Sequence, residues 1–211
     1  METAPVSVSP AGGLPSAQRR GTLFIVSGPS GVGKGTLVRG LVARDGDVRL
    51  SVSVTTRSPR PGEQEGVSYH FKTREAFDAL ARAGALLEHA QFGAHHYGTP
   101  REWVEAQQAA GHDVILEIDV KGAIQVRERS ESVVLVFVLP PSFEELAARL
   151  QGRQSETPEV VRQRLEIARE ELTFLPMYDY QIVNDDLEVA TRQLQAILEA
   201  ERCRVSRLAL T

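Results

Sequence analysis

The sequence contains little that could crosslink the chain or anchor it in a membrane. Its 211 residues include one cysteine, Cys203, so no internal disulfide can form, and we expect a reducing, cytoplasmic location. The longest apolar run, Val133–Leu139, is far shorter than the ~20 residues that cross a bilayer. No basic segment followed by an apolar one opens the chain, so no secretory signal is predicted. We therefore expect no membrane partner.

An excess of positive charge is also missing. The chain has 24 Lys and Arg against 28 Asp and Glu, a net charge of −4, which argues against nucleic-acid binding through the whole surface. Residues 1–20 are rich in Pro, Ser, Gly and Ala without a hydrophobic period, and we predict a disordered tail there. Residues 21–211 suffice for one large domain. Nothing in the composition specifies an oligomeric state.

The most informative segment is an apolar run, Leu23–Ser27, that leads into a glycine-rich turn and then into a helix-compatible segment. A phosphate-binding loop requires this order of strand, loop and helix. Glycines let backbone amides curl around a phosphate, and a lysine adds a mobile charge. A tight turn that binds nothing is the alternative. The residues expected to hold a nucleotide are Gly28, Pro29, Ser30, Gly31, Val32, Gly33, Lys34, Gly35 and Thr36.

One position departs from the common pattern of such loops. Gly35 follows the lysine, where a serine or threonine usually supplies a magnesium ligand. The first hydroxyl in the segment is that of Thr36, which is therefore the candidate metal ligand of the loop.

Strands and helices alternate along the chain, which predicts a three-layer α/β/α fold with a parallel central sheet. Two segments interrupt the alternation. Short extended pieces cluster between about 53 and 98, which indicates a small insertion with its own mixed sheet. The segment from about 142 to 172 is nearly all helical and strongly charged, which indicates a mobile helical lid.

Arginines mark both interrupting segments. Arg57 and Arg60 flank a proline in a hydroxyl-rich loop, and arginine forks suit phosphate oxygens, although a solvated basic loop is the alternative. The helical segment holds three more arginines: Arg149, Arg153 and Arg164. Taken alone, these three also fit a solvated helix face that alternates with glutamates.

Several further motifs occur in a fixed order. They are Ser-Val-Ser-x-Thr-Thr-Arg-x-Pro-Arg-x-Gly-Glu, Gly-Val-x-Tyr-His-Phe, Leu-Glu-His-Ala, Tyr-Gly-Thr, Glu-Ile-Asp-Val-x-Gly-Ala, Pro-Pro-Ser, Arg-Leu-x-Gly-Arg and Val-Asn-Asp-Asp. Together with the phosphate loop they span about residues 21–198, and over this range the chain resembles guanylate kinase. The resemblance implies an enzyme, a nucleoside monophosphate kinase of the phosphate-loop class. Its small-molecule substrates would be GMP and ATP, its products GDP and ADP, and its metal Mg²⁺.

The resemblance also implies roles for single residues. The phosphate of GMP would be held by Arg57, Arg60, Tyr69 and Tyr97. Guanine would be recognised by Ser53, Glu88 and Thr99. Asn184 would contact the adenine of ATP. The catalytic residues would be Lys34, the lid arginines Arg149, Arg153 and Arg164, and Asp119 near the metal and the reacting end of the nucleotide.

Elementary chemistry agrees with this assignment. Guanine presents a ring N–H beside an amino group, so the one carboxylate of Glu88 can accept both bonds, whereas adenine presents a lone pair there. A surface carboxylate at a strand end is the alternative for Glu88. ATP, a nucleoside monophosphate and one Mg²⁺ together carry about −4, and the loop lysine with the five arginines supplies positive charge to match.

Two other function classes remain open at this point. A guanylate-kinase-like domain can bind partner proteins without catalysis, but such domains typically lack an intact phosphate loop, which is present here. A phosphate-loop kinase for another small acceptor is the second alternative, and Glu88 with Ser53 argues against it.

Overall fold

The structure, a computed structural model, describes residues 17–130, 132–151 and 157–210. Five parallel strands form its central sheet, in the order β10 (Tyr180–Val183), β9 (Val134–Leu139), β2 (Leu23–Ser27), β8 (Asp113–Glu117) and β3 (Val48–Leu50). The strand that precedes the glycine-rich turn, β2, is buried along its whole length between β8 and β9. Parallel strands of this kind need cover on both faces.

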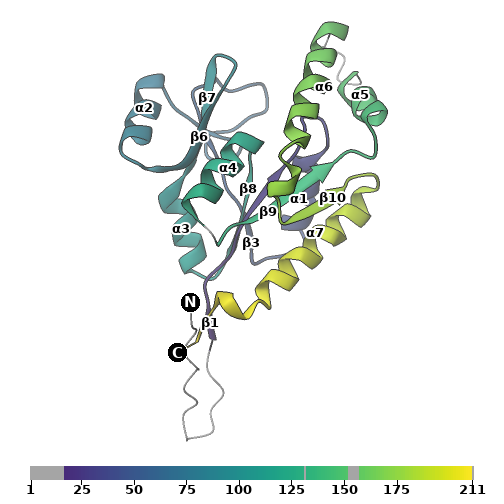
Figure 1. Cartoon of the computed structure of the whole chain (residues 1–211). Coiled ribbons are helices and arrows are strands. Elements are labelled where there is room, and N and C mark those ends of the chain that lie inside the picture. Colours follow the sequence, from purple (N-terminus) through teal and green to yellow (C-terminus); the bar gives the residue numbers. More distant parts are fainter. Residues whose placement is uncertain (1–16, 131, 152–156, 211) are drawn as a thin grey trace, which may run out of the picture.

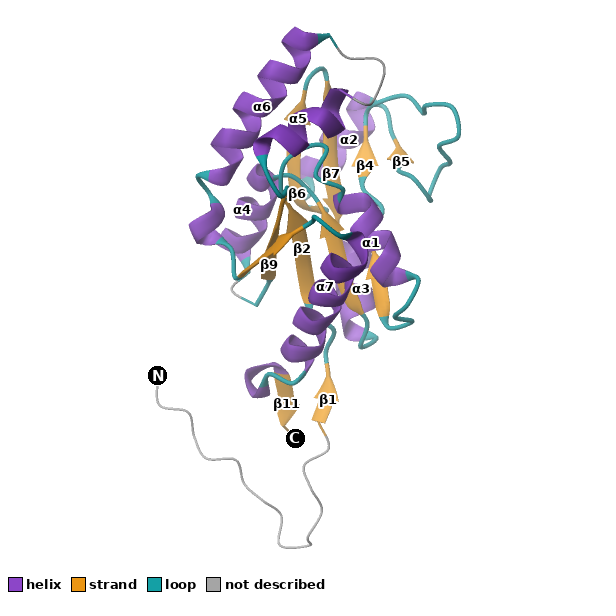
Figure 2. Cartoon of the chain, turned by 90° about the vertical axis from the view of Figure 1, so that its right-hand side faces the viewer, coloured by secondary structure: helices purple, strands orange, loops and turns teal. Residues whose placement is uncertain are grey.

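Helices supply that cover on both faces, because alternate residues of β2 point to opposite sides of the sheet. Phe24 and Val26 point into a core shared with α1 (Lys34–Val42) and α7 (Leu187–Arg202). The intervening Leu23 and Ile25 point into a second core with α3 (Arg101–Ala109) and α4 (Val120–Arg129). Figure 2 shows α1 and α7 in front of the central strands. The predicted three-layer α/β/α fold is confirmed.

A second, four-stranded sheet lies within the predicted insertion. Its order is β5 (His70–Phe71), β4 (Val54–Thr55), β7 (His95–Pro100) and β6 (Leu86–Phe92), with α2 (Arg74–Arg82) packed beside it. The sheet is mixed because β4 pairs parallel with β5 and antiparallel with β7. Figure 1 shows this sheet and α2 standing at one end of the central sheet.

Two helices fill the segment predicted as a lid. Helix α5 (Phe143–Gln151) and helix α6 (Pro158–Leu172) pack on each other through a small apolar cluster of their own, and a short 3₁₀ helix, η1 (Leu175–Met177), leads back to β10. Figure 1 shows α5 and α6 at the same end of the central sheet as the second sheet, on the other side of it. Among the described residues, no helix has both the length and the apolar character that crossing a membrane requires.

The prediction that residues 1–20 form a disordered tail is wrong for residues 17–19. Strand β1 (Ala17–Arg19) pairs antiparallel with β11 (Leu208–Leu210), which follows the 3₁₀ helix η2 (Val205–Arg207). Residues 1–16 lie outside the described residues. The strand forms because its partner comes from the other end of the chain, and tail composition alone carries no sign of that partner.

A buried carboxylate joins these terminal segments to the central sheet. Asp113, the first residue of β8, is fully buried and accepts bonds from the Thr22 amide (2.8 Å), from Arg202 Nε (2.7 Å) and from the Arg19 guanidinium. Arg202 ends α7 and Arg19 ends β1, so one side chain fixes both.

We expect Asp113→Asn to lower the free energy of unfolding by about 3 kcal/mol, because it removes the charge that compensates two partly buried guanidinium groups. Urea denaturation of the ligand-free protein at pH 7 measures this loss. Glu188→Gln is the matched control: its pairs with Arg44 and Arg192 are exposed, so it should leave the free energy of unfolding almost unchanged. Equal losses in the two variants would contradict the role given to Asp113.

Candidate active site

The glycine-rich turn has the backbone of a phosphate cradle. Gly28, Gly31 and Gly33 have φ values of 140°, 89° and 93°, which side-chain-bearing residues rarely adopt. A Cβ on Gly28 would stand 2.2 Å from the carbonyl oxygen of Val138 on β9. Gly33 is the N-cap of α1, so the amides of the loop and the positive end of the helix face the same space.

Lys34 and Asn184 both touch this loop. Lys34 Nζ donates to the carbonyl oxygens of Gly28 (2.6 Å) and Pro29 (3.1 Å). Asn184, at the end of β10, is buried, and its Nδ2 donates to the Val32 carbonyl at 2.8 Å. The structure therefore gives Asn184 a role in supporting the loop, which the sequence did not indicate.

A carboxylate that the sequence analysis passed over lies beside Gly35. The two Glu117 carboxylate oxygens are 3.1 and 3.3 Å from the place a Cβ on Gly35 would take, so glycine leaves room for this group. Glu117 ends β8, and the exposed Thr36 follows Gly35 on α1. The position of Glu117 at the end of a buried strand was the sequence signal that could have identified it.

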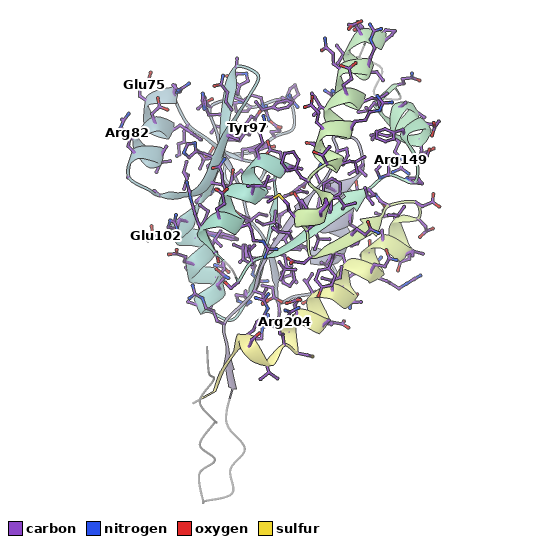
Figure 3. The ribbon with its side chains drawn as sticks, in the orientation of Figure 1. Glu75, Arg82, Tyr97, Glu102, Arg149 and Arg204 are labelled. Atoms are coloured by element: carbon purple, nitrogen blue, oxygen red, sulfur yellow. The ribbon has the colours of Figure 1, made fainter. Side chains whose placement is uncertain are left out.

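An arginine and two tyrosines cluster in the second sheet. Arg57 is buried, its guanidinium lies 5.4 Å from the centre of the Tyr69 ring, and the Tyr69 and Tyr97 rings are 6.0 Å apart. The alternative of a solvated loop is therefore wrong for Arg57. Figure 3 shows Tyr97 on the second sheet and Arg149 on α5, on the two sides of the end of the central sheet.

Glu63 holds the arginine loop in place. Its carboxylate accepts two bonds from Arg57, at 2.9 and 2.7 Å, and one from the Arg60 amide at 2.7 Å. The Arg57 hydrogen bond, followed by the Arg60 amide bond, lowers the pKa of Glu63, and the pairing raises the pKa of Arg57. The Arg60 residue itself is exposed.

Glu88 and Thr99 form a buried polar pair between β6 and β7. The Thr99 hydroxyl donates to Glu88 Oε1 at 2.7 Å, and both residues are almost fully buried. Glu88 Oε2 lies 2.9 Å from where a Cβ on Gly122 would stand, so α4 closes one side of this site. Burial raises the pKa of Glu88 to about 7, and the charge of Asp119 adds to the rise while the Thr99 bond opposes it. The alternative of a surface carboxylate is therefore wrong.

Two predicted residues lie at the margins of this pair. Asp119 is the N-cap of α4, and its side chain accepts from the Gly122 amide at 2.8 Å. Ser53 lies just before β4, is half-buried, and its carbonyl accepts from the His70 amide at 2.8 Å.

The lid arginines are divided between two helices. Arg149 on α5 donates to Glu145 (3.0 Å) and to the Asn184 carbonyl (3.0 Å), which places it beside the phosphate loop. Arg164 on α6 has a guanidinium nitrogen 3.5 Å from the Ser30 hydroxyl of the loop. Arg153 lies outside the described residues.

Glu171, in the last turn of α6, is a second acidic residue that the sequence analysis passed over. Burial raises its pKa to about 7, the charge of Lys34 opposes that rise, and the charge of Asp119 adds to it. No described residue donates to its Oε2 atom, which is buried. Glu171 therefore lies within electrostatic reach of Lys34 in the phosphate loop. In the sequence, Glu171 is one of two adjacent glutamates on a charged helix, and that pattern gave no sign of a role for it.

Comparisons with known proteins point to one family. The sequence profile described as guanylate kinase matches residues 20–201. A curated guanylate kinase from Desulfitobacterium hafniense (strain Y51) is 47% identical over 190 residues, covering 90% of this chain and 95% of the relative. One from Alkalilimnicola ehrlichii is 52% identical over 187 residues, covering 89% and 92%. A crystal structure of guanylate kinase from Anaplasma phagocytophilum superposes with a TM-score of 0.77 at 35% identity, covering 92% and 93%.

Phosphate loop, second sheet and helical lid define a phosphate-loop kinase of the nucleoside monophosphate class. The chain belongs to the guanylate kinase family.

The raised pKa of Glu88 makes stability depend on pH. The folded protein holds a proton on Glu88 up to about pH 7, whereas the unfolded chain loses it near pH 4.5, so this group costs stability as the pH rises between those values. As the pH rises from 5 to 8, we expect the free energy of unfolding of Glu88→Gln to increase by about 2–3 kcal/mol relative to that of the parent protein. Urea denaturation without nucleotide measures the difference. A difference independent of pH would contradict the burial of an ionisable Glu88.

Proposed function

We infer that the chain transfers the γ-phosphate of ATP to GMP, which gives ADP and GDP. The observation that supports this most directly is the buried Glu88–Thr99 pair at 2.7 Å. One oxygen of Glu88 is engaged by Thr99, and the carboxylate in its charged form accepts from a base that presents a ring N–H and an amino group together. Guanine presents both, whereas adenine places a lone pair against the carboxylate.

The proposed phosphate site of GMP is the cluster of Arg57, Tyr69 and Tyr97, together with Arg60. Glu63 accepts hydrogen bonds from both terminal nitrogens of the Arg57 guanidinium. A GMP phosphate would exchange with this carboxylate or bind beside it, and its dianion suits the arginine fork as well as Glu63 does. Tyr69 and Tyr97 would add hydroxyl donors.

ATP would bind at the phosphate loop, Gly28 to Thr36, with Asn184 close to its base. Lys34 and the lid arginines Arg149, Arg153 and Arg164 would neutralise the transferring group. The acceptor phosphate is already an anionic nucleophile, so no general base is needed. Catalysis then rests on in-line positioning and on charge stabilisation where closure excludes water.

Mg²⁺ belongs to this proposal, and the residues beside the phosphate loop fit it when nucleotide phosphates supply part of its shell. The described residues contain no group of three or more His, Cys, Asp and Glu side chains that could hold a metal. Thr36 and the Glu117 carboxylate flank Gly35, so they would hold Mg²⁺ directly or through water, with nucleotide phosphates completing the shell. The metal would reduce the charge on the phosphates, and Asp119 would lie near it.

The acceptor specificity tests the assignment. With ATP and Mg²⁺, the protein should phosphorylate GMP and discriminate against AMP by about 10⁴-fold in kcat/KM. Glu88→Gln should lower kcat/KM for GMP by a factor that corresponds to about 2–4 kcal/mol and leave the KM for ATP almost unchanged. A coupled assay with GMP, AMP, CMP, UMP and dTMP measures both. Comparable turnover of AMP would contradict GMP specificity, and no turnover of any acceptor would favour a non-catalytic module.

Lys34→Met tests the phosphate loop. The lysine charge acts on the transferring group, so kcat should fall by a factor that corresponds to about 3 kcal/mol or more, while GMP affinity stays nearly intact. Lys72→Met is the control, since Lys72 is exposed and precedes α2 outside the proposed site. Steady-state kinetics and calorimetric GMP binding supply the two readouts. A loss of GMP affinity as large as the loss in kcat in Lys34→Met would show that the lysine charge acts on bound GMP and not on the transferring group.

A further inference from the structure

A polar pocket, separate from the candidate active site, lies at the end of the central sheet opposite the phosphate loop. Its volume is about 350 Å³, within the range of small-molecule sites. The start of β2, helix α3, the end of α4 and η2 surround it. None of the residues proposed to bind GMP or ATP lines it.

The lining of this pocket is strongly basic. It includes four arginines and a single carboxylate: Arg20, Arg101, Arg129, Arg207 and Glu105. The whole chain carries a net charge of −4, so the pocket is basic against the general balance. Among the described carboxylates, none pairs with Arg20 or Arg129, whereas Arg101 has Glu105 at 3.6 Å and Arg207 has Glu201 at 2.8 Å.

Backbone carbonyls hold three of these guanidinium groups in place. Arg129 donates to the Leu87 carbonyl at 2.7 Å, Arg101 to that of Gly84 at 3.0 Å, and Arg207 to that of Ser132 at 2.6 Å. A guanidinium has five N–H donors, so each of these bonds leaves others for a ligand. Anchored forks lose little entropy when they bind an oxyanion.

The rest of the lining is suited to the body of an organic anion. Leu23, Leu87 and Val126 supply an apolar wall, and the hydroxyl-bearing Ser130 and Ser206 stand among the lining residues. An inorganic anion alone would leave that wall without a partner. A small phosphate ester would place its oxyanion on the arginine forks and its apolar part on the wall.

We propose that this pocket is a binding site for a small organic phosphate, separate from the substrate sites. Its place in the fold is notable because Leu87 immediately precedes Glu88 on β6, and Arg129 holds the carbonyl of Leu87. A ligand here would rest on the strand that carries the proposed guanine-binding carboxylate.

Phenyl phosphate and inorganic phosphate are the probes, and amide resonances in ¹⁵N NMR spectra of the full chain locate them. Phenyl phosphate should shift the amides of Thr22, Ser130 and Ser206 saturably and bind there more tightly than inorganic phosphate. No saturable shift of these amides in the millimolar range, or equal affinity of the two probes, would overturn the proposal.

Matched double variants test the arginines. Arg101→Gln with Arg129→Gln should weaken phenyl phosphate at these amides by tenfold or more, because each removes a charge-assisted bond. Arg44→Gln with Arg192→Gln changes the net charge equally at exposed positions beside Glu188 and should have no effect. Equal affinity in the two double variants would show that the arginines do not form a site. Lys34→Met should keep the pocket signals, which separates this result from the fate of the proposed kinase activity.

Discussion

The position of strand β2 at the centre of the parallel sheet constrains the rest of the structure. It is buried along its length between β8 and β9, so the phosphate loop can begin in one place only. Packing extends into the loop, where Gly28 approaches Val138 too closely for any Cβ. Because the carboxyl ends of neighbouring parallel strands share one edge, Glu117 from β8 and Asn184 from β10 come to the loop although they are far from it in sequence.

Internal partners bind several cations of this site. Lys34 donates to loop carbonyls, Arg57 binds Glu63, and Arg149 binds Glu145 and the Asn184 carbonyl. Under the proposed function, a substrate phosphate would exchange one charge-assisted bond for another, and the net gain of each exchange would be small compared with a bond formed from nothing. An exchange at Arg149 would also release a contact that holds α5 to the residue after β10. The proposal thus links substrate binding and the position of α5 through the same hydrogen bonds.

Local patterns in the sequence predicted most of the fold, and long-range contacts account for what was missed. Thr73 and Thr157 cap α2 and α6 as their residue types predict. Gly122 in the first turn of α4 lowers helix propensity, and only the structure explains that glycine, by its close approach to Glu88. Strand β1 needs a partner from the other end of the chain. In the site, the motifs pointed to Glu88 and Arg57, but their burial depends on tertiary packing. Glu117 had only its position at the end of a buried strand as a signal, and Glu171 had no local signal.

The burial of Glu88, on which the proposed base recognition rests, also makes its carboxyl a weak acid. At neutral pH the carboxyl stands near the midpoint of its titration, since burial raises its pKa to about 7. In the proposed complex, guanine would donate two bonds to the charged form and so lower that pKa on binding, which would make recognition and ionisation one event. The protonated form is different, because its O–H can donate to the lone pair of adenine. Discrimination against adenine is therefore a property of the ionised carboxylate. Since Thr99 donates to Glu88 and favours the ionised form, the hydroxyl of Thr99 would contribute to the proposed base selection without having to contact the base.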